Sequence, residues 1–361
     1  MNISVIGTVG LPASYGGFET LVEYLTDNLS NHYKLTVYCS RPAYKSFLQN
    51  YKGAELVYLP FKANGIQSIP YDVFSMIHAS RRADVLLILG VSGCIFLPVL
   101  RWFYKRKIIV NIDGLEWKRD KWSTLVKRFL KFSERLAVRY SDVVVADNPA
   151  ITDYVFNEYG NEAVTIAYGA DHVRSVGFPP RVLEKYPVLS SPYYFKVCRI
   201  EPENNIKMIL SAFSKIPEKK LVIVGNWDSS EFGKRQKEAF SSFCNIFLLD
   251  PIYDQDILNQ FRSNCICYVH GHSAGGTNPS LVEAMYLGLP ILAFGVNYNR
   301  ETTNHQALYF HNEQELIDLV NTTSDESLRT IGVAMKTYAS EHYTWERISS
   351  QYSQLFNEKE D

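Results

Sequence analysis

Short apolar runs alternate with longer amphipathic segments along the whole chain. The runs are rich in valine, isoleucine and leucine and are bounded by polar or glycine-containing turns, which is typical of strands. In the first half they are 3–7, 35–39, 56–60, 85–89, 107–111, 142–147 and 164–167. In the second half they are 193–200, 220–225, 245–250, 265–270 and 290–294.

Amphipathic segments with helical spacing separate these runs. The clearest segments of the first half are 18–30 and 123–140. Those of the second half are 205–216, 231–243, 254–262, 280–287 and 313–320. Continuous apolar strands that alternate with helices predict parallel sheets covered by helices on both faces. We therefore expect an α/β chain made of doubly wound, Rossmann-like domains.

A proline-rich segment divides the chain. Residues 176–192 contain four prolines, a composition typical of linkers. At 361 residues the chain is also long for a single core. We expect an N-terminal domain at 1–175, a C-terminal domain at 193–343, and a last helix in 344–361 that packs back on the N-terminal domain. Because ligands of such sheets bind at the carboxyl ends of the strands, we expect both domains to face a central cleft.

The sixteen residues between Asp84 and Arg101 carry no charge. A membrane-spanning helix needs about 20 apolar residues. This stretch is shorter and contains Gly90, Gly93 and Pro98. We therefore expect a buried strand, a glycine loop and a short helix rather than a membrane span.

The overall composition is that of an ordinary globular protein, with 46% apolar residues and a net charge of −1. This balance gives no reason to expect general nucleic-acid binding. The six cysteines are scattered and form no CxxC pair, which favours buried thiols in a reducing cytosol over disulfides or a zinc site. The first residues lead directly into a strand with no basic segment, so we expect a cytoplasmic protein without a signal peptide.

A glycine-rich loop follows the first strand, and Gly16 and Gly17 lie just before a helix. The loop has neither the GxGxxG pattern of dinucleotide-binding enzymes nor the Lys-Ser/Thr of a P-loop. Glycines here allow two interpretations. They form a tight turn with close packing, or they let an anionic ligand lie against bare backbone at a helix start.

A second loop, Ser273 to Ser280, has no bulky side chain and also leads into a helix. Asn278 or Ser280 can cap this helix. Glu283 lies one turn inside it, where a glutamate is usually a partner of the cap or the helix dipole. Because the small-residue loop precedes it, we favour a role for Glu283 in binding a ribose.

Four segments together resemble the retaining glycosyltransferases of the two-domain GT-B fold, in the large family numbered four. Glu283-Ala284-Met285 with Gly288 and Pro290 is similar to its E-A-M-x-x-G-x-P motif. The other three are TIAYGAD at 165–171, RIEPENNI at 199–206 and LVIVG at 221–225, in the family's order. The resemblance implies that Glu283 binds the ribose, that Arg199 holds the diphosphate and that Gly225 lies beneath the nucleotide.

Two N-terminal segments, GLPASYGGFET at 10–20 and NIDGLEWKRDKW at 111–122, resemble a subgroup that includes rhamnosyltransferases of bacterial surface polysaccharides. This resemblance implies a hexosyltransferase that uses dTDP-rhamnose and a polyprenyl-diphosphate-linked saccharide. It also implies a role in O-antigen, lipopolysaccharide or capsule synthesis.

The chain departs from the family at two positions. A second glutamate usually stands where this chain has Gly275, and a diphosphate-binding lysine stands where it has Asn204. Arg199 is then the main cation, helped by Lys207. Backbone N–H groups can replace part of the missing contacts. The expected phosphate- and donor-binding set is Gly16, Gly17, Arg199, Gly225, Gly276, Thr277, Asn278, Pro279, Ser280 and Glu283.

Asp113 ends the strand 107–111 and is our candidate for orienting acceptor or sugar hydroxyls. The alternative is a simple turn with Gly114, since Asp-Gly pairs are common in turns. With Arg199 and Glu283, Asp113 completes the expected catalytic set. Weaker candidates for acceptor binding are Tyr15, Glu116, Lys118 and Arg119.

No obligatory metal or cofactor is expected. Asp254 and Asp256 form an Asp-x-Asp pair, but they precede a helical run, where capping explains them. His270 and His272 lack a carboxylate or thiol partner at ligand spacing, which makes a poor zinc site.

Residues 101–139 carry twelve Lys/Arg and four Asp/Glu, a local charge of +8 that leaves −9 for the rest. Aromatic residues such as Trp102, Phe103, Trp117 and Trp122 are interleaved with these charges. A basic, aromatic surface suits an anionic bilayer, whereas a solvated helix face is the plainer interpretation. We expect peripheral contact with the inner face of the cytoplasmic membrane.

Two alternatives to a glycosyltransferase stay open. One is a GT-B epimerase or hydrolase that acts on the sugar nucleotide itself. The other is a non-catalytic sugar-nucleotide-binding subunit, which the departures at Gly275 and Asn204 allow.

Overall fold

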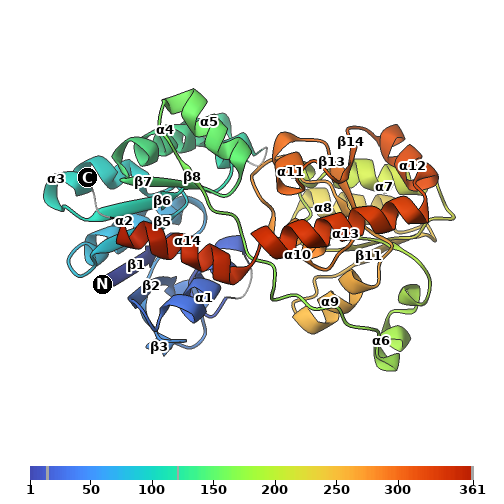
Figure 1. Cartoon of the computed structure of the whole chain (residues 1–361), viewed down its shortest axis with the longest axis horizontal. Helices are drawn as coiled ribbons and strands as arrows, with labels where there is room; N and C mark the ends of the chain where they lie inside the picture. Colours follow the sequence, from blue (N-terminus) through green and yellow to red (C-terminus); the bar gives the residue numbers. More distant parts are fainter. Residues whose placement is uncertain (14–15, 120–121, 359–361) are drawn as a thin grey trace. The chain divides into compact units, whose positions relative to one another are not determined.

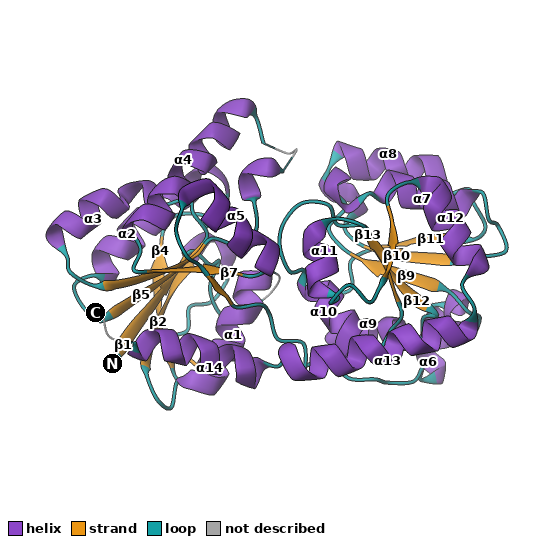
Figure 2. Cartoon of the chain, turned by 45° about the horizontal axis from the view of Figure 1, so that its top comes forward, coloured by secondary structure: helices purple, strands orange, loops and turns teal. Residues whose placement is uncertain are grey.

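The computed structural model describes residues 1–13, 16–119 and 122–358. Contacts within the chain define two units. The first contains Met1–Gly169 and Trp345–Asp361, and the second contains Ala170–Thr344. Each unit has one β-sheet with helices on both of its faces (Figure 1, Figure 2). The prediction of doubly wound α/β units is confirmed.

The strands of the first unit lie in the order β3-β4-β2-β1-β5-β6-β7-β8. All pairs are parallel except β3 with β4. The strands are β1 (Asn2–Ile6), β2 (Lys34–Ser40), β3 (Asn50–Tyr51), β4 (Ala54–Leu59), β5 (Val85–Leu89), β6 (Lys107–Asn111), β7 (Val143–Ala146) and β8 (Val164–Thr165).

The direction of winding changes between β1 and β5 in this sheet. Ile3 of β1 pairs with Leu35 of β2 on one side and with Val85 of β5 on the other. Every residue of β5 is buried, as expected for a strand covered on both faces. The loops after β1 and β5 therefore flank the switch point, where doubly wound sheets bind ligands.

Helices cover both faces of the first sheet. They are α1 (Gly17–Leu29), α2 (Ser68–Ala79), α3 (Leu97–Phe103), α4 (Thr124–Tyr140), α5 (Pro149–Tyr159) and α14 (Trp345–Asn357). Short 3-10 turns are η1 (Arg41–Ala43), η2 (Gly65–Gln67), η3 (Cys94–Phe96) and η4 (Glu116–Lys118).

Helix α14, red in Figure 1, ends the chain but packs on α1 at its beginning. The Trp345 ring stacks on Tyr24 at a centroid distance of 4.4 Å, and Asn28 Nδ2 donates to Ser349 Oγ at 3.0 Å. Tyr352 is completely buried, and its hydroxyl accepts from Asn111 Nδ2 at 2.8 Å. The last helix is thus an integral part of the first unit.

The strands of the second unit lie in the order β11-β10-β9-β12-β13-β14, and all pairs are parallel. The strands are β9 (Tyr194–Val197), β10 (Leu221–Val224), β11 (Ile246–Leu249), β12 (Cys267–His270), β13 (Ile291–Phe294) and β14 (Leu308–Phe310). The helices are α6 (Pro180–Lys185), α7 (Ile206–Ser214), α8 (Glu231–Phe240), α9 (Gln255–Ser263), α10 (Pro279–Tyr286), α11 (Asn297–Thr302), α12 (Glu313–Thr322) and α13 (Asp325–His342). The 3-10 turns are η5 (Pro187–Ser190), η6 (Pro202–Asn204) and η7 (Trp227–Ser229).

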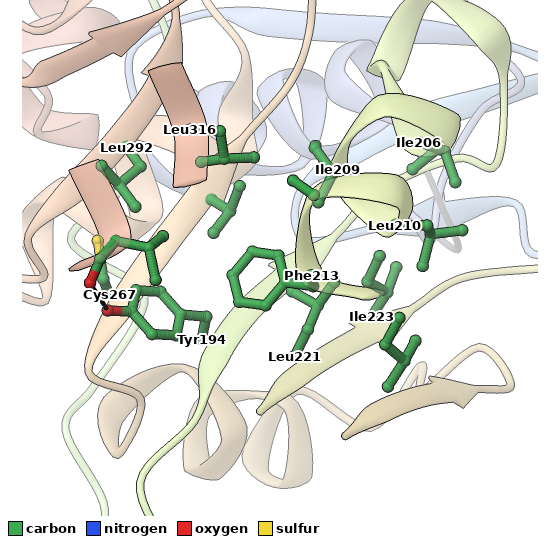
Figure 3. Packing of buried hydrophobic residues seen from close by; sticks show 14 of the residues in the cluster. Tyr194, Ile206, Ile209, Leu210, Phe213, Leu221, Ile223, Cys267, Leu292 and Leu316 are labelled. Atoms are coloured by element: carbon green, nitrogen blue, oxygen red, sulfur yellow. Dashed lines mark hydrogen bonds between the residues drawn. The ribbon is translucent and has the colours of Figure 1, made fainter. Parts of the chain in front are cut away.

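The apolar core of the second unit lies between α7, α12 and the sheet. Phe213 of α7 lies among Tyr194, Leu221 and Leu292, which come from three different strands (Figure 3). Because residues of α7 such as Ile209 are completely buried, the helix is fixed rigidly on the sheet. The loop that joins β9 to α7 is therefore held at both of its ends.

The switch point of this sheet lies between β9 and β12, which are neighbours although β10 and β11 separate them in the sequence. The loop after β9 contains Arg199, and the loop after β12 leads to α10 and Glu283. Both segments singled out in the sequence thus leave the carboxyl ends of the two central strands. Ligands of open α/β sheets bind at this place.

The uncharged stretch before Arg101 forms β5, η3 and α3, which confirms the predicted strand, loop and short helix. In the described part of the chain, no helix is long and apolar enough to cross a bilayer. The proline-rich residues 176–192 contain α6 and η5 and belong to the second unit. All six cysteines are free thiols, three of them buried.

Candidate nucleotide-sugar site

Helix α10 begins at the small-residue loop and is capped as predicted. Asn278 Oδ1 accepts from the backbone N–H of Ser280 at 3.0 Å, and Pro279 occupies the first helical position. Both features are typical of helix starts. The same Asn278 oxygen accepts from Ser280 Oγ at 2.7 Å, which fixes the first turn further. The start of α10 therefore has a defined geometry.

Glu283 lies one turn inside α10 and is buried. Its Oε1 lies 3.0 Å from His172 Nε2, and its Oε2 forms an ion pair with Arg262 Nη2. A carboxylate only accepts hydrogen bonds, so His172 donates here. Arg262 comes from the last turn of α9, and its side chain is 4% exposed. Three elements that are distant in the sequence thus meet at one carboxylate.

The charge of Glu283 is maintained despite its burial. Burial alone raises the pKa of a carboxyl group, but the attraction of Arg262 and the hydrogen bond from His172 outweigh it. The net result is a pKa below the ordinary value for glutamate. An ionised carboxylate offers about four acceptor positions, of which these two partners use two. Glu283 can therefore still accept hydrogen bonds from the hydroxyls of a ligand.

The sequence did not indicate His172 or Arg262 as partners of Glu283. Arg262 Nε and Nη1 are buried and find no partner among the described residues. No motif joins these positions, because the contact depends on how α9 and the segment after β8 fold against α10. The only signal is an arginine placed just before a buried strand.

Arg199 lies after β9 and is exposed. No described residue forms an ion pair with its guanidinium, which leaves this cation available to an anionic ligand. The side chain of Asn204 stabilises the same loop. Its Nδ2 donates to Arg199 O at 2.9 Å, and its Oδ1 lies 3.2 Å from His272 Nδ1. Lys207, the predicted second cation, is also exposed, on α7. The amide at position 204 therefore ties the loop after β9 to the loop after β12.

The backbone of Gly275 does not suit the glutamate that the resemblance led us to compare with this position. Its φ is +137°, a conformation that residues with a side chain rarely adopt. A Cβ at this position would lie 2.8 Å from His272 Nε2. A carboxylate cannot be accommodated without rearrangement of this loop.

The neighbouring loop residues are more enclosed than the sequence indicates. Gly276 and Thr277 are buried, and Thr277 Oγ1 lies 3.4 Å from Thr302 Oγ1. Gly225 is required by packing, since a Cβ there would lie 2.5 Å from Ile200 Cδ1. Their contact with a donor stays a prediction.

In the first unit, the Glu19 carboxylate lies close to Gly16, whose contact with a donor stays a prediction. The φ of Gly16 is +139°, and a Cβ there would overlap the Glu19 carboxylate at 1.8 Å. That carboxylate is buried and accepts from Val9 N at 2.8 Å and Thr8 Oγ1 at 3.0 Å. An acidic group in the first turn of α1 also repels a second anion. Gly17 begins this helix.

Asp113 follows β6 and has a φ of +61°, which is uncommon for a residue with a side chain. Asn111 Oδ1 accepts from its backbone N–H at 2.9 Å and supports this conformation. Such backbone strain is concentrated at functional sites. The turn with Gly114 and a functional role for Asp113 are therefore compatible.

The predicted acceptor residues lie around η4. Arg119 Nε is 2.8 Å from Glu116 Oε2, so these two side chains compensate each other. Lys118 is exposed, with its Nζ 5.4 Å from the centre of the Trp117 ring. Tyr15 lies outside the described residues.

The other polar candidates have structural explanations. Asp254 caps α9 through the N–H groups of Asp256 and Ile257 at 2.9 and 3.2 Å, which confirms the capping interpretation. His270 is 2% exposed, and its burial and the nearby Lys196 lower its pKa well below the ordinary value. Among the described residues, no cluster of three or more His, Cys, Asp or Glu could hold a metal.

Comparison with known families divides the chain at nearly the same place as its contacts. Residues 1–171 match a family described as a domain of unknown function (DUF1972). Residues 184–329 match the family described as Glycosyl transferases group 1. The second match contains Arg199, Arg262 and Glu283.

Several solved structures share the whole architecture. Sucrose-phosphate synthase from Thermosynechococcus elongatus aligns with a TM-score of 0.82 at 16% identity over 98% of both chains. Anabaena HepE in complex with UDP aligns with a TM-score of 0.75 at 16% identity, covering 98% of this chain and 99% of HepE. A glycosyltransferase from Rickettsia africae gives 0.73 at 12% identity, covering 98% and 97%. The chain therefore has the GT-B fold, and the family match over residues 184–329 supports a glycosyltransferase.

Proposed function

We propose that the protein is a retaining hexosyltransferase that moves L-rhamnose from dTDP-rhamnose to a saccharide linked to a polyprenyl diphosphate. Its product would be an intermediate of O-antigen or capsule synthesis. The resemblance of segments 10–20 and 111–122 to rhamnosyltransferases supports the choice of sugar. Anabaena HepE, a neighbour in fold, is described with UDP and with UDP-glucose, which supports a nucleotide-sugar donor.

The observation that carries this proposal is the geometry of Glu283. A buried, ionised carboxylate lies at the start of α10, beside the switch point of the second sheet. Arg262 and His172 fix its orientation while acceptor positions stay available. Buried acceptors of this kind select ligands with hydroxyl groups, because an unpaired ligand would leave them unsatisfied. A ribose provides two neighbouring hydroxyls for such a carboxylate.

Arg199 supplies the positive charge for the reaction that we propose. Cleavage of the bond between sugar and diphosphate leaves negative charge on the phosphate. A guanidinium offers two parallel donors to such an oxyanion. The start of α10 adds N–H groups and the positive end of a helix dipole. Removal of one preorganised donor typically lowers the rate by about 10²–10³-fold.

The acceptor hydroxyl must lose its proton during the transfer. In the retaining reaction that we propose, it attacks from the face that the diphosphate leaves, and the departing phosphate takes the proton. Asp113 then orients hydroxyls of the acceptor or the sugar. No nucleophile from the protein is needed for this route.

Membrane contact belongs to the same proposal. Trp102 and Phe103 of α3 are 87% and 72% exposed and lie beside the basic helix α4. Basic residues near an anionic surface each contribute roughly 1 kcal/mol. We propose peripheral binding to the inner face of the cytoplasmic membrane, where a lipid-linked acceptor is found.

The proposal is tested by incubating the protein with a panel of nucleotide sugars and a synthetic prenyl-diphosphate saccharide. A product mass increased by one deoxyhexose, only with dTDP-rhamnose, supports it, and the anomeric configuration of that product tests retention. Sugar release without acceptor would instead indicate a hydrolase. Nucleotide binding with no turnover on any donor would indicate a non-catalytic subunit.

A further inference from the structure

A basic cavity lies in the first unit. Its volume is about 830 Å³, within the range of small-molecule sites. Helix α4 lines one side with Lys127, Arg128, Lys131, Phe132 and Arg135. The opposite side is formed by η4 and by the end of α5. We call this cavity the α4 groove.

The basic residues form one face of α4. Lys127, Lys131 and Arg135 follow one another at intervals of four, and Arg128 lies three positions before Lys131. Side chains at such spacing point to the same side of a helix. The opposite face, which contains Leu130, Ala137 and Val138, is buried in the unit. Like charges at this spacing repel one another, and a bound anion would reduce this repulsion.

The groove contains more positive than negative charge. Five cations line it, since Lys118 of η4 faces the four from α4, and Glu158 is the one carboxylate among the described lining residues. Glu158 Oε1 lies 3.0 Å from Lys131 Nζ and is therefore already compensated. Arg128 and Arg135 form no ion pair with any described residue. This excess selects a ligand with more than one negative charge.

Lys131 is fixed by its surroundings and shapes one wall of the groove. Its Nζ lies 4.7 Å from the centre of the Trp117 ring and 4.9 Å from that of Tyr159. Oε1 of the buried Glu134 lies 3.6 Å from Lys131 Nζ and compensates part of its positive charge. This wall is rigid and aromatic, and it offers apolar surface beside the charges.

Arg128 and Arg135 are the cations most open to a ligand. Both are exposed, and neither forms an ion pair within the described ranges. A guanidinium binds a phosphate through two parallel hydrogen bonds. Two such groups on one helix face can hold two linked phosphates.

Exposed apolar side chains lie on α4 in and near the groove: Phe132 lines it, and Leu125 follows the lining residue Thr124. Phe132 is 52% exposed, and Leu125, which precedes Arg128 by three positions, is 77% exposed. Large exposed apolar residues beside cations are typical of surfaces that bind amphiphiles. A ligand with an anionic head and a hydrocarbon chain satisfies both features. A flat bilayer alone cannot enter a concave cavity.

We infer that the α4 groove binds the diphosphate of a polyprenyl-diphosphate-linked acceptor. This inference rests on the proposed function, because it identifies where that acceptor is held. Arg128 and Arg135 contact the phosphates, the aromatic wall contacts the first sugar, and Leu125 and Phe132 contact the prenyl chain.

The test compares two charge-matched double variants of the full chain. Arg128→Gln/Arg135→Gln changes the groove, and Lys105→Gln/Arg139→Gln removes two exposed cations of the same basic region outside it. Farnesyl diphosphate is the probe, measured by calorimetry. We expect the groove variant to bind it at least tenfold more weakly than the wild type, and the control variant within twofold. Lys118→Gln, which changes η4 rather than α4, should bind farnesyl diphosphate severalfold more weakly than the wild type.

Vesicles of phosphatidylcholine with phosphatidylglycerol measure general attraction to anionic lipid. Both double variants should lose vesicle binding to the same extent, because they lose the same charge. Equal losses of farnesyl diphosphate affinity in the two double variants would overturn the inference. So would absence of farnesyl diphosphate binding by the wild type, or a single-stranded RNA that competes for the groove more strongly than the diphosphate.

These outcomes are independent of sugar transfer. If no donor is turned over but farnesyl diphosphate binding depends on Arg128 and Arg135, the proposed transferase activity is refuted. The proposed binding of a diphosphate in the α4 groove is then supported. If rhamnose is transferred and both double variants transfer it equally well, the groove is refuted and the transferase is not. Thermal unfolding of each variant shows that its fold is intact.

Discussion

Glu283 and His172 are 111 residues apart in the sequence, and their side chains lie 3.0 Å from each other in the folded second unit. The contact gives a carboxylate on α10 a fixed direction. With Arg262 on its other oxygen, Glu283 is held in one orientation before any ligand binds. Preorganisation of this kind lowers the entropy that a ligand must lose on binding.

Glu283→Gln should weaken the binding of dTDP at least tenfold. The amide keeps the shape of the side chain but loses the charge and one acceptor group, and it leaves Arg262 buried without a counterion. Calorimetry at neutral pH measures the change. Glu326→Gln on the exposed surface of α13 is the matched control and should bind dTDP as the wild type does. An unaffected Glu283→Gln protein would contradict our assignment of the ribose site.

Arg262→Met should reduce the free energy of unfolding by about 3–5 kcal/mol, because the buried Glu283 charge is left uncompensated. Urea unfolding measures this loss. The double variant Arg262→Met/Glu283→Gln should recover much of it, since no unpaired charge remains. If the double variant instead lost as much stability as the two single variants together, the two side chains would not interact.

The same pair predicts how stability depends on pH. The pKa of Glu283 is lower in the folded protein than in the unfolded chain. Its contribution is therefore complete above the ordinary pKa of glutamate, about 4.3, and is lost as the pH falls below that value. In Glu283→Gln, the free energy of unfolding should decrease less steeply than in the wild type as the pH falls below about 4.3. An identical acid limb would argue against an ionised Glu283.

Arg199→Ala should lower kcat/KM of sugar transfer by about 10²–10³-fold, because it removes the main cation expected at the leaving diphosphate. Its midpoint of thermal unfolding should not change, since the side chain is exposed. Lys207→Ala provides the comparison and should have a smaller effect. A rate within twofold of the wild type would exclude Arg199 from the phosphate site.

Gly275→Ala should destabilise the protein by about 1–3 kcal/mol, owing to its positive φ and the close approach to His272. Gly177→Ala is the control, because a Cβ there meets no atom within 4 Å. Gly275→Glu should not restore activity typical of family members with two glutamates. A Gly275→Glu enzyme that is more active than the wild type would show that the loop can rearrange.

The raised pKa of Asp72 predicts that the stability of the protein falls between about pH 4 and pH 8. This residue is buried in α2, and burial raises its pKa to about 8. The folded state therefore keeps a proton that the unfolded chain loses near pH 4, and stability falls as the pH rises from about 4 to 8, by about 1.4 kcal/mol per unit. Asp72→Asn should remove this slope. If the urea midpoints of the wild type and of Asp72→Asn changed in the same way between pH 5 and 9, the raised pKa of Asp72 would be contradicted.

Local patterns predicted the parts of this fold that depend on neighbours in the sequence. The alternation of apolar runs and helices, the caps Asn278 and Asp254, and the strand, loop and helix before Arg101 all follow from residues within a few positions of one another. Helix α13 was not predicted. Its buried stripe includes Gly332 and Ala339, whose small side chains give a weak apolar signal.

The candidate site could be predicted only in part. Arg199 and Glu283 belong to recognisable segments, but Arg262 and His172 reach Glu283 through tertiary packing that no spacing encodes. Gly16 shows a second limit. The sequence could not indicate that a Cβ at this position would overlap the Glu19 carboxylate, and the predicted contact of Gly16 with a donor stays a prediction.

The first unit is completed by a segment that is made after the whole second unit. Tyr24, Asn28 and Asn111 cannot form their contacts with Trp345, Ser349 and Tyr352 until these three residues have been synthesised. At about 5–20 residues per second, a ribosome needs roughly 10–35 s to make the intervening second unit. During that time an apolar stripe beside α1 is uncovered, so nascent chains should depend on chaperones until α14 has been made.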